Sequence, residues 1–175
     1  MGVNVGKFTK RLARQASKVI AFEPVPWSLE QLRENTRSLS NVEIVAAAAG
    51  TTSGTVKLFR HPEFSSNPDA NSHSSSIIAD KENISKDEYF DLPPVDVVEL
   101  ILGLDQQVGV LKVDIEGAEV ELFETMFNRQ DVMSRIHYIF AQTHEDRIPG
   151  HKPRVEQLKS LAQKMPKPKI DLNWY

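Results

Sequence analysis

The feature that most constrains the fold is an apolar run, Val108–Val113, that ends directly in Asp114-Ile115-Glu116-Gly117. After the glycine, apolar residues recur at the spacing of one helix face. This pattern is typical of a buried strand in a parallel sheet that hands over at once to a helix. Open α/β sheets bind ligands outside the carboxyl ends of their strands. We therefore expect Asp114 and Glu116 to stand in a binding crevice.

The rest of the chain alternates between short apolar runs and helical patterns. Strands are expected at 18–22, 42–48, 108–113 and 136–141, and helices at 7–16, 28–39, 120–127 and 155–165. Such alternation indicates parallel strands with helices packed on both faces. A chain of 175 residues is long enough for one domain with its own core. The sequence thus predicts a single α/β domain, residues 1–175, built around a doubly wound, mostly parallel sheet.

Residues 60–94 interrupt this alternation. The segment carries four prolines, a serine run and mixed charge, with Ile77-Ile78 as an apolar pair. Loops of this length are uncommon in compact domains and usually serve as lids, binding loops or disordered insertions. We expect a long loop or insertion here, either a lid on the acceptor side of the site or a disordered segment without a role.

The beginning of the sequence is expected to form the cofactor half of the same crevice, with Asp114 and Glu116 in its acceptor half. Gly2 and Gly6 precede a helical pattern, and glycines there let the backbone turn tightly and approach a ligand. Glu23 follows a short apolar run, at a distance where an acidic side chain usually accepts hydrogen bonds from ribose hydroxyls. Asn4 is either a ligand residue or a turn residue with positive φ. Such a loop normally follows a buried strand, and we expect that this first strand is missing from the chain.

Composition narrows the possible functions. Lysine and arginine number 21 against 24 acidic residues, a net charge of −3, so no basic field indicates binding to nucleic acid. No apolar run reaches the ~18 residues that a membrane span requires. The absence of cysteine removes disulfides and thiolate chemistry, and the cytoplasm is the default compartment.

Three motifs together resemble the FkbM-type methyltransferases. They are Gly2-Val3-Asn4-Val5-Gly6-Lys7-Phe8-Thr9, Val19-Ile20-Ala21-Phe22-Glu23-Pro24 and Leu111-Lys112-Val113-Asp114-Ile115-Glu116-Gly117-Ala118-Glu119. The resemblance implies a Rossmann-like fold of the class I methyltransferase type and S-adenosylmethionine as cofactor. It also implies methyl transfer to a hydroxyl, often on a sugar or secondary metabolite. The cofactor positions carried over are Gly2, Asn4, Gly6 and Glu23. The family's first strand would lie before Met1, so we expect an N-terminally truncated domain.

A hydroxyl acceptor must lose its proton, which requires a base within about 3 Å. Asp114 and His144 follow adjacent predicted strands, and an imidazole titrates near neutral pH. His144 is the candidate base, and Asp114 or Glu116 either orients it or serves as the base itself. The same three side chains could instead hold a divalent metal, but without a further Asp or Asn pair at suitable spacing we predict none.

Two other functions remain open on sequence grounds. A catalytically inactive or fragmentary methyltransferase-fold domain would keep the same motifs. A nicotinamide-dependent oxidoreductase would share Glu23, but Asn4 and Thr9 do not fit the Gly-x-Gly-x-x-Gly pattern. The acceptor, expected to be a small molecule or a carbohydrate, is not defined by the sequence, and neither is the oligomeric state.

Overall fold

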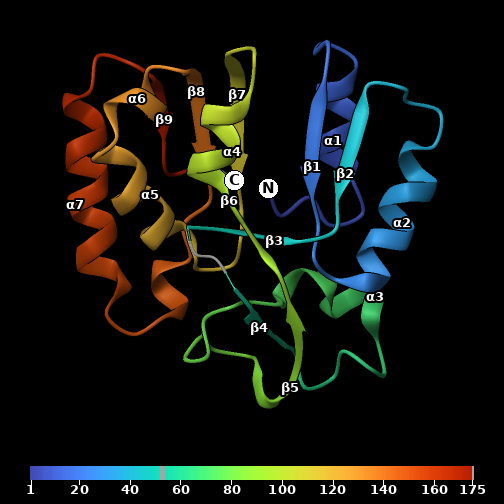
Figure 1. Ribbon diagram of the computed structural model, residues 1–175. Helices are drawn as coiled ribbons and strands as arrows, with labels where there is room; N and C mark the ends of the chain where they lie inside the picture. Colours follow the sequence, from blue (N-terminus) through green and yellow to red (C-terminus); the bar gives the residue numbers. More distant parts are fainter. Residues whose placement is uncertain (52–53, 175) are drawn as a thin grey trace.

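The computed structural model describes residues 1–51 and 54–174, with helices and parallel strands in alternation (Figure 1). The α/β class and the parallel pairing predicted from the sequence are confirmed. Over the described residues the strands form several small sheets rather than one continuous sheet.

The N-terminal half contains α1 (Lys7–Ala13), β1 (Val19–Phe22), α2 (Pro26–Thr36) and β2 (Val42–Val45). Strands β1 and β2 pair in parallel, with Val19 opposite Val42 and Phe22 opposite Val45. Pro26 occupies the first turn of α2, where a missing N–H and a fixed φ favour helix initiation. Strand β1 ends at Phe22, so Glu23 lies in the short connection between β1 and α2.

The C-terminal half contains β7 (Val108–Val113), α5 (Glu119–Phe127), α6 (Gln130–Met133), β8 (Ile136–Ala141), η2 (Glu145–Arg147), α7 (His151–Lys164) and β9 (Lys169–Asp171). The three strands are parallel in the order β7-β8-β9, and α5 and α7 pack together beside them (Figure 1). Phe123, Ile139 and Leu158 are buried in the main core here. The expected burial of β7 is confirmed for its last three residues, Leu111–Val113, whereas Val110 is 39% exposed.

The middle of the chain contains β3 (Ala48–Gly50), β4 (Val56–Arg60), α3 (Pro68–Asn71), η1 (Ser72–Ser74), β5 (Ser85–Leu92), β6 (Pro94–Asp96) and α4 (Val97–Gly103). Strand β3 pairs in parallel with β6, and β4 pairs with β5 as an antiparallel hairpin. A second small core, formed by Val25, Leu58 and Phe64, joins this hairpin to the N-terminal half. The segment 60–94 therefore includes regular structure that its charged sequence did not indicate.

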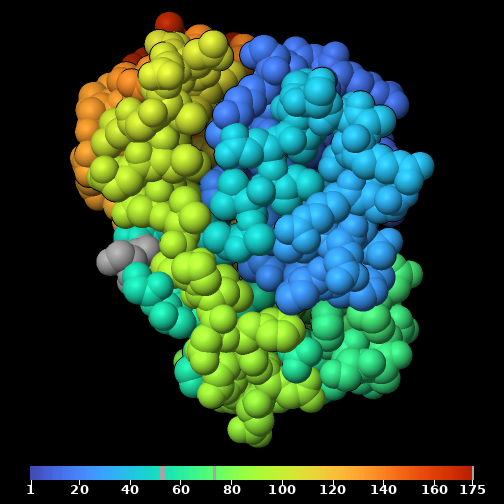
Figure 2. Space-filling view, turned by 45° about the vertical axis from the view of Figure 1, so that its right-hand side comes forward, coloured from blue at the N-terminus to red at the C-terminus, as the bar shows by residue number. Residues whose placement is uncertain are grey.

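Among residues 1–51 and 54–174, no strand pairing joins the two halves. Strand β1 pairs with β2 and β7 pairs with β8, while the facing edges of β1 and β7 bound a groove of about 1000 Å³. Figure 2 shows the seam between the blue N-terminal residues and the yellow-green residues of α4. Residues 1–3 bridge only the carboxyl ends of these strands, where Met1 N donates to Lys112 O at 2.7 Å and Val3 N to Phe22 O at 3.3 Å. The single doubly wound sheet expected from the sequence is therefore not confirmed, because the described strands form separate small sheets.

In the described part of the chain, no helix combines the length and the apolar character needed to cross a membrane.

Candidate functional site

A cavity of about 120 Å³ lies at the carboxyl ends of β1 and β7. Glu23, which follows β1, and Asp114, which follows β7, both line it. Ala48 at the start of β3 and Ser72 in the segment 60–94 also line it. Four stretches that are far apart in sequence therefore meet at one point, as the rule for open parallel sheets predicts.

The N-terminal loop reaches this cavity through two residues with left-handed backbone conformations. Gly2 has φ of 64°, and a Cβ there would overlap the backbone carbonyl of Asp114, so only glycine allows this close approach. Asn4 has φ of 48° and accepts a hydrogen bond from Ser72 Oγ at 3.2 Å. Gly2 and Asn4 line the cavity, whereas Gly6 lies at the start of α1 and packs against Leu32.

Glu23 is almost completely buried, with 4% of its surface exposed. Its Oε2 accepts from Asn4 N at 2.7 Å and its Oε1 accepts from Val25 N at 3.0 Å. Burial disfavours the carboxylate and raises the pKa of Glu23 to about 7, although the two backbone hydrogen bonds act in the opposite direction. Glu23 therefore changes charge near neutral pH, in the wall of the cavity.

The lining of the cavity also includes three small apolar side chains, Ala47, Ala48 and Ala49, and the larger Ile115. Carboxylates and small apolar residues in the same lining suit a ligand with a hydroxylated sugar and a flat ring. The cavity is smaller than the ~300–1,000 Å³ of most small-molecule sites. Because Ser72 is hydrogen-bonded to Asn4 across it, a nucleoside-sized ligand requires residues near Ser72 to move.

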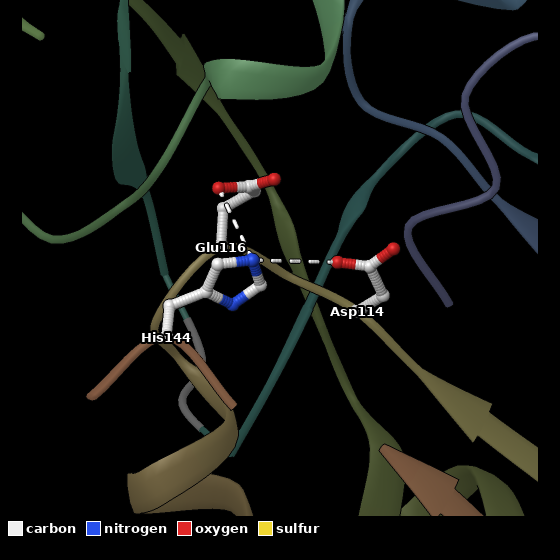
Figure 3. Close-up of side chains that lie close together, drawn as sticks. All are labelled: Asp114, Glu116 and His144. Atoms are coloured by element: carbon white, nitrogen blue, oxygen red, sulfur yellow. Dashed lines mark ion pairs between the residues drawn. The ribbon is translucent and has the colours of Figure 1, made fainter. Parts of the chain in front are cut away.

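Asp114, Glu116 and His144 form a tight cluster beside the cavity (Figure 3). His144 Nε2 lies 3.4 Å from Glu116 Oε2 and 3.7 Å from Asp114 Oδ1. The structure therefore brings together the three residues proposed as catalytic. Asp114 and Glu116 belong to the cavity lining, whereas His144 is buried and does not belong to it. Glu116 has φ of 57°, a strained conformation held by the contacts around it.

Two lysines that sequence reasoning missed pair with this cluster. Lys81, almost fully buried, places Nζ 2.7 Å from Glu116 Oε2 and also donates to Ser74 O at 2.7 Å. Lys112 Nζ lies 2.9 Å from Asp114 Oδ2 and 2.9 Å from Gly2 O. Lys112 could have been found, because residues two apart share one face of a strand. Lys81 comes from the segment 60–94, and its sequence neighbourhood gives no sign of this contact.

The cluster changes the charge state expected of His144. Burial alone would lower its pKa, but hydrogen bonding to Glu116 and Glu119 outweighs burial and raises the pKa to about 10. Burial would raise the pKa of Glu116, and His144 and Lys81 together lower it below its usual value. At neutral pH the site thus contains an imidazolium among carboxylates, rather than a neutral imidazole.

The donor atoms of Asp114, Glu116 and His144 all lie within 4.8 Å of one another, and their chemical types suit a divalent ion. An ion at this position would have to displace the His144 proton, because metal ligation requires neutral imidazole. It would also compete with Lys81 and Lys112 for the same carboxylates. The contacts favour a salt-bridged cluster over a metal centre.

Comparison with known proteins agrees with the motifs that line the site. The family model described as methyltransferase FkbM domain matches residues 1–166. No significant match was found among curated proteins or among solved structures. Because the matched region covers nearly the whole chain, including the glycine loop, Glu23 and the Asp114–Glu119 motif, the chain belongs to the FkbM methyltransferase domain family.

Proposed function

We propose that this chain is an S-adenosylmethionine-dependent O-methyltransferase domain with a Rossmann-like arrangement of its two strand–helix halves. Its acceptor would be a hydroxyl of a small molecule, sugar or glycan. One observation carries the proposal: Glu23 and Asp114, at the carboxyl ends of two strands from different halves, line the same cavity. Membership of a methyltransferase family supports the reaction type.

The cofactor would lie across the tips of β1 and β7. Glu23 would accept hydrogen bonds from the ribose hydroxyls, because its carboxylate lies in the wall of the cavity. Gly2 and Asn4 would bring the backbone close to the ligand, with Gly6 setting the turn into α1. The small side chains of Ala47–Ala49 would leave room for the adenine ring. When bound, the cofactor supplies a methyl group on a sulfonium, and the transfer depends on alignment of that methyl group with the acceptor hydroxyl.

The acceptor hydroxyl must give up its proton as the new bond forms. His144 already carries a proton at neutral pH, so the proton acceptor is better sought among the carboxylates. Asp114 is the strongest candidate, because it lines the cavity and its side chain is more exposed than that of Glu116, while Lys112 and His144 hold it in place. Glu116, paired with Lys81, would help to hold the imidazolium in place. A positioned base of this kind contributes roughly 10²–10⁴-fold to the rate.

Calorimetric titration with S-adenosylmethionine tests the proposal directly. The wild-type chain should bind S-adenosylmethionine in preference to NADH, and Glu23→Gln should weaken binding by at least about tenfold. Glu30→Gln, which changes an exposed carboxylate on α2, is the matched control and should leave the affinity unchanged. Equal affinity in wild type and Glu23→Gln would remove the ribose assignment, and preferential binding of NADH would favour an oxidoreductase.

The small cavity favours one other function, a methyltransferase-fold domain that binds no cofactor and therefore does not turn over. The Ser72–Asn4 hydrogen bond and the 120 Å³ volume leave little space for a nucleoside. If this alternative is correct, the folded chain will show no heat of binding with S-adenosylmethionine at millimolar concentration. Measurable binding abolished by Glu23→Gln would exclude it.

A further inference from the structure

Glu119 is a fully buried carboxylate, with none of its surface exposed, and the proposed chemistry does not yet use it. It begins α5, three residues beyond Glu116, and does not line the cavity. Isolated buried carboxylates are costly and normally appear only where several partners satisfy them. The burial of Glu119 therefore requires partners that stabilise its carboxylate.

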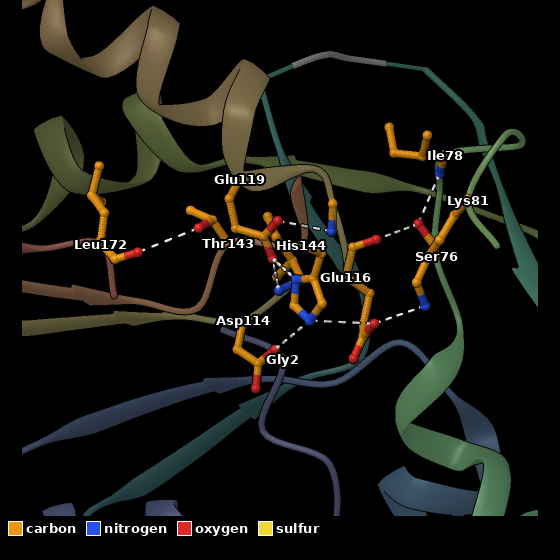
Figure 4. Close-up of polar contacts among 12 residues, drawn as sticks. Gly2, Ser76, Ile78, Lys81, Asp114, Glu116, Glu119, Thr143, His144 and Leu172 are labelled. Carbon is orange, nitrogen blue, oxygen red and sulfur yellow. Dashed lines mark hydrogen bonds and ion pairs between the residues drawn. The ribbon is translucent and has the colours of Figure 1, made fainter. Parts of the chain in front are cut away.

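Two backbone hydrogen bonds and one ion-pair contact surround this carboxylate (Figure 4). Its Oε1 accepts from Ile115 N at 2.6 Å and its Oε2 accepts from Gly117 N at 2.8 Å. The third partner is His144, whose Nδ1 lies 3.3 Å from Glu119 Oε1. One side chain thus holds the backbone of the turn that carries Asp114 and Glu116, and at the same time faces the histidine between them.

The imidazole of His144 has a carboxylate on each of its two sides. Nδ1 faces Glu119, and Nε2 faces Glu116 and Asp114 (Figure 4). In neutral imidazole only one ring nitrogen carries a proton, whereas both are donors in the imidazolium. Carboxylate oxygens at ion-pair distance from both ring nitrogens favour the charged ring, although Nδ1 makes no hydrogen bond to Glu119 in this geometry.

We propose that Glu119 is a positioning residue that fixes the orientation and the positive charge of His144, so that Nε2–H is aimed at Asp114 and Glu116. The raised pKa of His144, to about 10, agrees with this role, because Glu119 is one of its causes. The groups around His144 carry more negative than positive charge, with four carboxylates against two lysines. Facing or neighbouring groups are Lys81 ahead of β5, Lys112 on β7, Asp114 and Glu116 in the turn, Glu119 on α5, Glu145 in η2 and His151 on α7.

The functional part of this inference rests on the proposed methyl transfer. An imidazolium held beside Asp114 keeps that carboxylate oriented toward the cavity and offsets its neighbours' negative charge. Asp114 is then an ionised carboxylate, which can accept a hydrogen bond from the acceptor hydroxyl and take up its proton. Without Glu119, His144 would become neutral at a lower pH, and the activity profile would change on its alkaline side.

The test is an NMR titration of the ring nitrogens and carbons of His144, which requires neither acceptor nor turnover. In the wild-type chain both ring nitrogens should show protonated shifts at pH 8. In Glu119→Gln, which preserves size, the pKa of His144 should fall by about 1–3 units. Glu121→Gln, an exposed carboxylate on the same helix, should leave this pKa unchanged.

A neutral His144 in the wild type at pH 8 would overturn the inference, even if Glu119→Gln does not fold. An unchanged His144 pKa in folded Glu119→Gln would also overturn it. Binding of S-adenosylmethionine separates the two proposals. If the NMR results hold but the wild type binds no S-adenosylmethionine, the proposed function fails while the role of Glu119 stands. If transfer occurs, Glu119→Gln should shift the alkaline limb of its pH profile, which a purely structural role would not do.

Discussion

The burial of Glu23 predicts that the stability of this protein falls as pH rises through neutrality. The pKa of Glu23 is raised from 4.5 to about 7 in the folded chain, mainly by burial. A group with a raised folded-state pKa contributes stability that is fully present below its unfolded pKa, and this contribution is lost as pH rises through the folded pKa. The window for Glu23 is therefore pH 4.5 to about 7.

The magnitude follows from the size of the shift. At about 1.4 kcal/mol per pKa unit, the whole shift corresponds to about 3 kcal/mol, of which about 2.5 kcal/mol is lost between pH 5 and pH 8. Glu23→Gln removes the titration but keeps the size of the side chain. The variant also weakens the hydrogen bonds to Asn4 N and Val25 N, a cost that should differ little between the two pH values.

The assay is urea unfolding of wild type and Glu23→Gln at pH 5 and pH 8, with free energies from linear extrapolation. The quantity of interest is the difference between the two proteins in how much stability each loses over this interval. Other titrating groups, His144 among them, are present in both proteins and largely cancel. We expect the wild type to lose about 2.5 kcal/mol more than the variant. Equal losses of unfolding free energy in the two proteins would refute the prediction that the buried Glu23 titrates near neutral pH.

Three further predictions concern single contacts of the site. Gly2→Ala should destabilise the chain by more than about 1 kcal/mol and abolish cofactor binding, because its Cβ would overlap the Asp114 carbonyl. Thermal melts and calorimetry check both effects, and Gly103→Ala, where a Cβ meets open space, should show neither. Lys81→Met should cost about 3 kcal/mol in urea unfolding, because it leaves Glu116 without its buried partner. Lys86→Met removes an exposed ion pair with Asp80 and should cost under about 1 kcal/mol; equal costs would contradict a stabilising role of the buried Lys81–Glu116 pair. Asp114→Asn should lower methyl transfer at least about tenfold with cofactor affinity retained, and a smaller loss would clear Asp114 of the role of base.

Sequence reasoning found the parts of the fold that depend on local patterns. The apolar run Val108–Val113 is the strand β7, and it delivers Asp114 to the cavity as its position predicted. Glu23 and Asp114 were assigned to one crevice, and both line it. These succeed because strand ends and turn residues are encoded within about ten residues of each other.

The features that sequence reasoning missed depend on distant contacts or on short, polar strands. Strand β9 is three residues long and begins and ends in charged residues, Lys169 and Asp171, so no apolar run marks it. Strand β5 presents Phe90 and Leu92 inward between charged neighbours, which disguises it within the segment 60–94. The charge of His144 was also misjudged, because Glu119 and Lys81 reach the cluster through tertiary packing. These contacts have no signature in sequence spacing.

The central claim is that a sulfonium nucleoside lies across the tips of β1 and β7, between Glu23 and Asp114. Its most direct test is an NMR titration of the chain with S-adenosylmethionine that maps chemical-shift changes onto backbone amides. We expect the largest changes at Asn4, Glu23, Ala48 and Ile115, which line the small cavity. Changes confined to Val19, Leu104 and Gly109, which line the groove between the two halves, would place the ligand elsewhere and contradict the account.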